Sequence, residues 1–554
     1  MILRTLTRAH APRSILRHGL RQTRRTAQPL RSYTTGQTAS MPLSTPQSQA
    51  SMLATITTDL DKIAPRFEIQ PDQIRIIQTP TEFYEILKTK ILNAQSRIYL
   101  STLYIGKTEH DLISTIRTAL LKNPSLRISF LTDALRGCRE TPKQSCASLL
   151  APLITEFGNR VEVRMFHTPN LTGLRKKYIP KRINEGWGLQ HMKLYGIDDE
   201  IIISGANLSS DYFTNRQDRY HLFSSSALTD YFSKIHNGVC DLSFSIQPAP
   251  NTPAGYTITW PISNPSPSPL DSPSAFKTAA SKHLSHLLTP SNTPPSTSSS
   301  TTPSNTHIYP ILSLVPLLDT STELPALTNL LQRLATPPFH PSTWTFTAGY
   351  FNMTSSFRRL LLATRPHSGT VLTAHPHANG FFGSKGVSGM LPAAYTHLAK
   401  TFLRRVKYEG LSESVHLREW ERGVVGREGG WTYHAKGLWV TFPRSCLDSA
   451  TNDTTETSSS NGKDAITAAE QETPSLTVVG SSNYTKRSYE LDLEANVIIA
   501  TSDPGLRKRL GEEVKWLSEY ATAVDEKTFE EKERRVSVGV KLSMWVVRVL
   551  GGAL

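Results

Sequence analysis

A short pattern that could carry out phosphodiester chemistry occurs twice in this chain: histidine, any residue, lysine, then an apolar run. The two copies are residues 190–198 (QHMKLYGID) and 433–441 (YHAKGLWVT). Side chains two positions apart in a strand lie on the same face, so each histidine lies beside its lysine. A neutral imidazole can attack phosphorus, and a neighbouring ammonium can hold the non-bridging oxygens. His191 with Lys193, and His434 with Lys436, are therefore candidate catalytic pairs.

Each copy is followed by a second strand-like run that ends in a glycine-containing turn and an asparagine. The turns read SGAN at 204–207 and GSSN at 480–483. The amides of Asn207 and Asn483 can donate a further hydrogen bond to a phosphate, and a histidine from the other copy can protonate the leaving oxygen. One copy alone would be weak support, because a surface histidine or a core strand explains it equally well. Two copies predict one shared active site.

The spacing after the two asparagines also agrees. Asp218 and Glu494 each follow their asparagine by eleven positions. The interval from histidine to asparagine is longer in the second copy, and a polar run over 447–474 accounts for most of the difference. One charged position differs, because Asp198 of the first copy corresponds to Thr441 in the second.

The residues around these motifs must form elements that position them. Strand-like runs at 97–104, 126–132, 161–166 and 200–204 alternate with helix-like runs, and the order repeats at 344–351, 369–373, 415–420 and 476–479. Alternating strands and helices predict an α/β sandwich in each half. A chain of 554 residues also exceeds the ~250–300 residues at which single cores stop growing, which favours two lobes.

The predicted organisation has five parts. They are a mitochondrial transit peptide over 1–33, a first lobe over 55–245, a Pro/Ser/Thr-rich linker over 246–306, a second lobe over 307–528 with the polar insertion 447–474, and an apolar and basic tail over 529–554. The linker is predicted because its composition is too polar to form a core. The sequence contains no run of about 18 uncharged apolar residues, so no membrane-spanning helix is predicted. The tail fits a buried closing element and a segment at a membrane interface equally well.

Positive charge is concentrated at the N-terminus. Residues 1–33 contain eight arginines and no lysine, and the first acidic residue is Asp59. An arginine-rich, acid-poor, amphipathic start is typical of mitochondrial transit peptides, although a basic tail that binds nucleic acid or lipid has a similar composition. Removing these eight charges lowers the formal net charge from +15 to +7, which suits an anionic substrate or a membrane surface.

No metal or cofactor site is predicted. The four cysteines show no CxxC spacing, and in a long chain with an organelle address they are expected to be free thiols. His167, His375 and His377 have no acidic or cysteine partner at ligand spacing in the sequence, so we interpret them as loop histidines.

The paired motifs resemble the HxK(x)4D element of the phospholipase D superfamily and the turn with asparagine that follows it. Within that superfamily, the chain is similar to the phosphatidylglycerophosphate synthases. The similarity is carried by residues 203–220, 378–383, 433–439 and 487–494. It implies two phospholipase D-like α/β/α sandwich lobes, packed as a pseudo-dimer with the active site at their interface.

The resemblance implies a role for each matching residue. His191 would be the nucleophile that forms a phosphatidyl-histidine intermediate, and His434 the general acid and then the general base, although the roles could be exchanged. The residues that would bind phosphate are Lys193, Lys436, Asn207, Asn483 and Ser482, and those that would orient the histidines are Asp218 and Glu494. Asp198 completes the first motif and would therefore be a catalytic residue. The corresponding position of the second motif is Thr441, however, which favours a structural role for Asp198.

The resemblance also implies a reaction, the transfer of a phosphatidyl group from CDP-diacylglycerol to glycerol 3-phosphate with release of CMP. Its place would be the matrix side of the inner mitochondrial membrane, in phosphatidylglycerol and cardiolipin synthesis, with peripheral contact to anionic lipid and no nucleic-acid partner. The residues alone leave alternatives open. A phospholipase, a nuclease and a serine phosphatidyltransferase use the same chemistry, and Thr441 is also compatible with a catalytically inactive lipid-binding scaffold.

Overall fold

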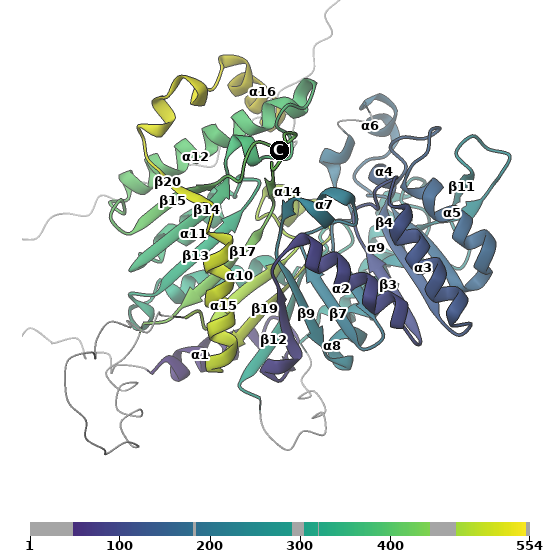
Figure 1. Ribbon diagram of the computed structural model, residues 1–554, viewed down its shortest axis with the longest axis horizontal. Coiled ribbons are helices and arrows are strands. Elements are labelled where there is room, and N and C mark those ends of the chain that lie inside the picture. The colour runs from purple at the N-terminus through teal and green to yellow at the C-terminus, as the bar shows by residue number, and fades with distance from the viewer. Residues whose placement is uncertain (1–47, 181–183, 291–303, 319–320, 444–472, 550–554) are drawn as a thin grey trace, which may run out of the picture. The chain divides into compact units, whose positions relative to one another are not determined.

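The computed structural model describes residues 48–180, 184–290, 304–318, 321–443 and 473–549. Two nine-stranded sheets form the centres of two lobes, so the predicted α/β class is confirmed (Figure 1). The predicted transit peptide and nearly all of the predicted polar insertion lie outside the described residues.

The first sheet has the strand order β11-β10-β5-β4-β3-β6-β7-β9-β2. Its strands are β2 (Ile74–Ile77), β3 (Arg97–Ser101), β4 (Arg127–Asp133), β5 (Val161–Phe166), β6 (Leu194–Ile197), β7 (Glu200–Ser204), β9 (Tyr220–Ser224), β10 (Phe244–Pro248) and β11 (Tyr256–Thr259). The second sheet has the order β1-β12-β19-β18-β17-β13-β14-β15-β20. Its strands are β1 (Phe67–Glu68), β12 (Thr306–Ser313), β13 (Thr343–Ala348), β14 (Ser368–Ala374), β15 (Val415–Trp420), β17 (Lys436–Thr441), β18 (Leu476–Gly480), β19 (Glu494–Thr501) and β20 (Ala521–Val524).

The two sheets repeat one topology. β3, β4 and β5 are parallel neighbours, and so are β13, β14 and β15. β6 and β17, which begin beside the two histidine–lysine pairs, run antiparallel to β3 and β13. The antiparallel series β7, β9 and β2 then corresponds to β18, β19 and β12. The repeat seen in the motifs is therefore a repeat of the whole fold.

Helices pack on the faces of both sheets. The outer core of the first lobe is formed with α2 (Pro80–Asn93), α3 (His110–Lys122) and α5 (Cys146–Phe157), and that of the second with α10 (Glu323–Leu334), α11 (Ser355–Ala363) and α12 (Leu391–Tyr408). A third core contains side chains of α8 (Ser226–Cys240), α9 (Pro273–Leu288) and α15 (Pro504–Leu517) together with residues of both sheets.

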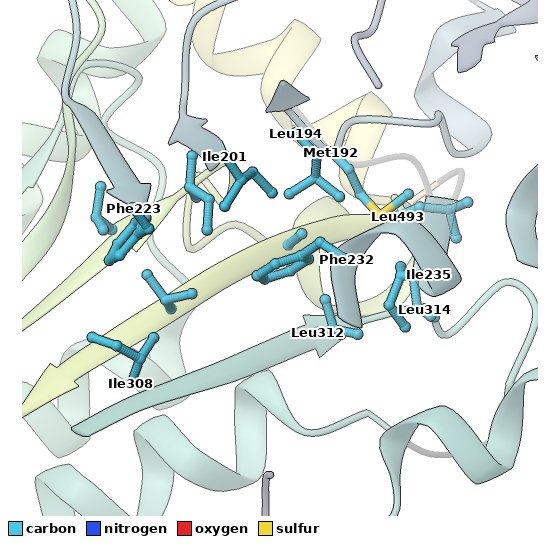
Figure 2. Close-up of a cluster of buried hydrophobic side chains, with 14 of the residues drawn as sticks. Met192, Leu194, Ile201, Phe223, Phe232, Ile235, Ile308, Leu312, Leu314 and Leu493 are labelled. Carbon is cyan, nitrogen blue, oxygen red and sulfur yellow. The ribbon is translucent and has the colours of Figure 1, made fainter. Parts of the chain in front are cut away.

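This third core joins the lobes. Side chains from both lobes that meet in it include Met192, Leu194, Ile201, Phe223, Phe232, Ile308, Leu312 and Leu493 (Figure 2). Burial of apolar surface is the dominant favourable term in such packing. The short strands β8 (Arg216–Gln217) and β16 (Thr432–Tyr433) also pair in parallel from one lobe to the other. The lobes therefore form the predicted pseudo-dimer.

The predicted linker over 246–306 is wrong for its first part. β11 extends the first sheet, and α9 buries Phe276, Ala280, Leu284 and Leu288 in the core between the lobes. Residues four positions apart lie on one helix face, so this stripe is enough to anchor the helix. The surrounding proline, serine and threonine residues lower the average apolar content of the segment, so its mean composition did not reveal this apolar stripe.

Both ends of the described chain pack on the second lobe. α1 (Gln49–Leu60) contributes buried side chains to the outer core of that lobe, and β1 pairs with β12. The expected start of the first lobe at residue 55 therefore falls inside an element that packs on the second. At the other end, the expected tail includes α16 (Val538–Val549), which contacts α12. Among the described residues, we find no helix with the length and apolar character needed to cross a membrane.

Candidate active site

Both histidines lie at the carboxyl edge of parallel strands. His191 comes shortly before β6, whose first residue pairs with the last residue of β3. His434 comes shortly before β17, whose first residue pairs with the last residue of β13. This edge is where open α/β sheets place their binding sites. The repeated topology thus sets the two histidines at equivalent positions in the two lobes.

Each histidine is attached through its backbone to the opposite lobe. The N–H of His191 donates to the carbonyl of Leu493 at 2.9 Å, and the N–H of His434 donates to the carbonyl of Gln217 at 2.8 Å. Each of these carbonyls belongs to the residue directly before a predicted histidine-orienting acid. The two bonds therefore bring each acid to the histidine of the other lobe.

The imidazole–carboxylate pairs cross between the lobes accordingly. Nδ1 of His191 lies 2.9 Å from Oε2 of Glu494, and Nδ1 of His434 lies 2.6 Å from Oδ2 of Asp218. All four side chains are buried. A carboxylate on Nδ1 fixes the ring orientation and leaves Nε2 for chemistry at phosphorus. Neither lobe holds a complete pair by itself, so the site is formed by the interface.

The two carboxylates differ in charge state. Burial alone would raise the pKa of Asp218, but the charge of Lys436 and the hydrogen bond from His434 bring that pKa below its ordinary value. Burial raises the pKa of Glu494 to about 7, against the opposing effect of Lys193. Asp218 is therefore ionised at neutral pH, whereas Glu494 is partly protonated.

Both imidazoles are neutral in the resting site. Burial, together with the neighbouring charge of Lys436, lowers the pKa of His434 to about 3. Burial, together with the charge of Lys193, lowers the pKa of His191 well below its ordinary value. A neutral imidazole has the free lone pair that attack on phosphorus requires.

The two lysines are held differently. Nζ of Lys193 donates to the carbonyl of His191 at 2.7 Å. Nζ of Lys436 donates to the carbonyl of His434 at 2.8 Å and lies 3.3 Å from Oδ2 of Asp218. Burial lowers the pKa of both lysines, most strongly for Lys193. The period-two prediction that each lysine lies beside its histidine fits this geometry.

The predicted phosphate-binding asparagines are both buried. The side-chain oxygens of Asn207 and Asn483 have no hydrogen-bond partner within the described residues. Leaving a buried polar atom unpaired costs free energy, so a bound ligand that pairs with it offsets that cost. With the amide turned over, the same position presents an NH₂ donor to a phosphate oxygen. Ser482 differs, because its N–H already donates to Asn496 and its hydroxyl accepts from the N–H of Tyr484.

Asp198 does not join this cluster. It lies in the turn after β6, at the opposite end of that strand from His191, and seven residues of extended chain span about 20 Å. Its carboxylate accepts hydrogen bonds from the backbone N–H groups of Gln95, Ser96 and Arg97. The assignment of Asp198 as catalytic is therefore corrected, since its contacts tie the β6–β7 turn to the start of β3.

Three residues of the site were not predicted from the motifs. The hydroxyl of Tyr212 lies 3.4 Å from Nε2 of His434, and the ring of Tyr350 stands edge-on to the same imidazole at 5.0 Å between centroids. The hydroxyl of Ser481 donates to Glu494. Tyr212 lies five positions after Asn207 and Ser481 two positions before Asn483, but only the folded structure shows which way their side chains point.

A buried ion pair fixes the interface beside the site. Both oxygens of Glu513 on α15 accept from Arg219, at 2.9 and 2.8 Å, and one also lies 2.9 Å from Nε2 of His221. Trp439 donates to the same carboxylate at 2.9 Å. Arg219 directly follows Asp218, so this network also restrains the backbone that carries an orienting acid.

One cluster of possible metal ligands lies at the end of β14 and β15. His375, His377 and Glu421 place their ligand atoms within 4.8 Å of one another. The sequence interpretation missed Glu421, because two parallel strands bring it beside the histidines from a distant position. Nδ1 of His377 lies 2.8 Å from Glu421, and Nδ1 of His375 accepts from the N–H of His377. These hydrogen bonds explain the cluster without a metal, and the absence of a metal stays a prediction.

The fold contains two copies of one α/β topology. Each copy carries a histidine–lysine pair, and each histidine contacts an acid from the other copy. This arrangement defines the phospholipase D class of fold. No protein-family model matches the chain. The CDP-diacylglycerol–glycerol-3-phosphate 3-phosphatidyltransferase of Saccharomyces pastorianus is 42% identical over 514 residues, which cover 92% of this chain and 94% of the relative. The mitochondrial enzyme of the same name from Homo sapiens is 33% identical over 509 residues, which cover 87% and 83%. The chain belongs to the CDP-diacylglycerol–glycerol-3-phosphate 3-phosphatidyltransferase family.

A solved structure supports the fold. Phosphatidylserine synthase from Haemophilus influenzae Rd KW20 superposes with a TM-score of 0.64, covering 90% of this chain and 98% of its own. At 18% sequence identity, this likeness concerns the fold alone.

Proposed function

We propose that the chain transfers a phosphatidyl group from CDP-diacylglycerol to glycerol 3-phosphate, giving phosphatidylglycerophosphate and CMP. The relatives that match over most of its length carry this activity in their names. The observation that supports the chemistry is the crossed pairing of two neutral imidazoles with acids from opposite lobes. Such an arrangement supplies a nucleophile and a separate proton carrier at one place.

In the first step, Nε2 of His191 attacks the phosphorus that bears the diacylglycerol. The negative charge of the bound substrate favours the imidazolium form of His434, which takes up a proton from solvent as the substrate binds. The bond from that phosphorus to the CMP oxygen breaks, and His434 donates this proton to the leaving oxygen. The ionised Asp218 stabilises this imidazolium. Lys193 and Lys436 offset the negative charge that develops on the non-bridging oxygens. The product is a phosphatidyl-histidine.

In the second step, the acceptor hydroxyl of glycerol 3-phosphate gives its proton to His434, which is now neutral. The hydroxyl oxygen attacks the phosphorus, and the bond between phosphorus and Nε2 of His191 breaks. His434 releases this proton to solvent when the product leaves, so the enzyme returns to its resting state with both imidazoles neutral. Exchanging the two histidine roles would leave this balance unchanged.

We place this activity in the mitochondrion, at the matrix face of the inner membrane. Vertebrate relatives are named as mitochondrial, and residues 1–33 have the composition of a transit peptide. The product would enter phosphatidylglycerol and cardiolipin synthesis. The expected partners are the two substrates and an anionic lipid surface, with neither nucleic acid nor a cofactor.

An acceptor comparison tests the reaction. The purified full chain is incubated with CDP-diacylglycerol labelled in its phosphatidyl group, and with glycerol 3-phosphate, serine or water alone as acceptor. We expect phosphatidylglycerophosphate and CMP in the first case and far less product in the others. If serine or water competes successfully with glycerol 3-phosphate, the proposed acceptor is wrong. If His191→Ala and His434→Ala both leave CMP release unchanged, the cluster is not catalytic.

A trapping experiment tests the two histidine roles. CMP is a stable anion and can leave without full protonation, so His434→Asn should still form the phosphatidyl-histidine but discharge it slowly. Mass spectrometry of the protein should then find a phosphatidyl group on His191. His191→Asn should carry no such group. The reverse pattern would exchange the two roles.

A further inference from the structure

The C-terminal helix α16 turns apolar side chains toward solvent. Val538, Leu542, Trp545 and Val546 are all exposed, with Leu542 at 58% and Trp545 at 60%. Their spacing of three or four positions places them along one side of the helix. Val540 is buried instead and faces the protein. A surface helix normally turns its apolar stripe inward, so this outward stripe needs a partner outside the described protein.

Two more segments combine exposed apolar residues with cations. In the loop 381–390, Phe382, Val387 and Met390 are exposed beside Lys385. In α6 (Gly173–Tyr178), Leu174 and Tyr178 are 73% and 70% exposed, and the three residues 175–177 between them are all arginine or lysine. None of the three segments contains an aspartate or glutamate, and α16 also carries the exposed Lys541.

These segments lie around the catalytic edge of the two sheets. α6 follows the carboxyl end of β5, and the loop 381–390 follows the carboxyl end of β14, at the edges where the histidines lie. α16 contacts α12, whose first turn adjoins the same loop. The ring of Phe381 lies 5.4 Å from that of Tyr350, which contacts His434. In Figure 1, α6 and α16 both lie at the upper side of the view.

We propose that α6, the loop 381–390 and α16 form a docking face that binds the surface of an anionic phospholipid bilayer. The inference rests on the proposed function, because a donor with two acyl chains is held in a bilayer and the active site must meet it there. Exposed apolar side chains with a tryptophan among them enter the boundary between headgroups and acyl chains. The interspersed lysines and arginines are attracted to anionic headgroups, and none of the three segments contributes a carboxylate of its own.

Charge reversal within the stripe of α16 tests the docking face. The full chain carrying Leu542→Glu and Trp545→Glu is compared with wild type in sedimentation with phosphatidylcholine vesicles, with and without phosphatidylglycerol. We expect wild type to bind the anionic vesicles preferentially, and the double variant to bind them about tenfold or more weakly. The control is Leu121→Glu on α3, where the leucine is 55% exposed. Leu121 lies near the end of α3, which leads from the catalytic edge of the sheet back to the opposite edge. This variant should bind like wild type.

Activity measurements separate this proposal from the proposed reaction. With CDP-diacylglycerol in vesicles, the double variant should lose activity in step with its binding, whereas in detergent micelles it should match wild type. Equal vesicle binding by wild type and the double variant would overturn the docking face, even with phosphatidyltransferase activity intact. Failure of wild type to make product in micelles would overturn the proposed reaction and leave the vesicle result standing. A wild-type dimer that the double variant abolishes, with vesicle binding unchanged, would assign the face to a second copy of the chain.

Discussion

Replacing Glu513 by glutamine should test how strongly the buried ion pair holds the lobes together. The side chains of Glu513 and Arg219 are 2% and 0% exposed. The substitution leaves one oxygen to accept from the guanidinium and turns an amide NH₂ toward it in place of the other. Arg219 keeps hydrogen bonds to the carbonyl of Val478 and the hydroxyl of Thr477, but its charge loses the only carboxylate that contacts it within the described residues. Breaking a buried pair in this way costs about 3–5 kcal/mol.

Urea unfolding followed by circular dichroism would measure this loss. A free energy of unfolding of about 5–15 kcal/mol is typical, so the expected change is a large share of the total. The matched control is Glu82→Gln, because Glu82 pairs with Arg75 at 2.9 Å on the surface and such pairs contribute about 0–1 kcal/mol. Glu513→Gln should also lower activity before unfolding, because Arg219 adjoins Asp218. Equal losses in the two variants would refute the interlobe role.

Three further outcomes are expected. Burial raises the pKa of Glu494 from 4.5 to about 7, so between these pH values the native state holds a proton that the unfolded state releases. As the pH rises from 4.5 to 7, the free energy of unfolding of wild type relative to Glu494→Gln should fall by up to about 1.4 kcal/mol per pH unit in urea titrations. A relative stability that rises with pH would contradict the raised pKa. Leu284→Ala in α9 should lower the free energy of unfolding by about 2–5 kcal/mol. An unchanged urea midpoint would show that this segment is a linker and not part of the core. Asp198→Asn should lower the melting temperature but leave kcat intact, whereas a lower kcat at unchanged stability would restore a catalytic role.

The local motifs were sufficient to predict the two lobes and the two histidine–lysine pairs that the structure brings to their interface, but they placed Asp198 there wrongly and missed Tyr212 and Tyr350. His-x-Lys followed by a strand and an asparagine turn is a local pattern, and strand periodicity alone places its members on one face. The crossing of Glu494 to His191 and of Asp218 to His434 was not predictable, because it depends on how two separate sheets pack. The same limit concealed Glu421 beside His377, since the register of β14 and β15 brings together residues far apart in sequence.

Average composition was misleading where a few positions decide the structure. The segment with α9 has many polar residues, yet four side chains on one helix face are enough to join it to the core between the lobes. α16 shows the converse, since an apolar tail predicted either burial or an interface, and its helix buries Val540 while exposing Leu542 and Trp545. Periodicity within a segment therefore carries more structural information than the mean over it.

The two halves keep one backbone geometry but reverse the charges around it. The residues four and nine positions after the motif asparagines are Asp211 and Arg216 in the first lobe, and Arg487 and Asp492 in the second. Each pair forms a salt bridge, at 2.8 and 2.7 Å, so position is conserved while sign is exchanged. The acids that contact the two histidines also differ, since burial raises the pKa of Glu494 to about 7 while Lys436 and His434 bring the pKa of Asp218 below its ordinary value. An ionised acid stabilises an imidazolium better than a partly protonated one does, and this difference supports our proposal that His434 carries the proton and His191 attacks phosphorus.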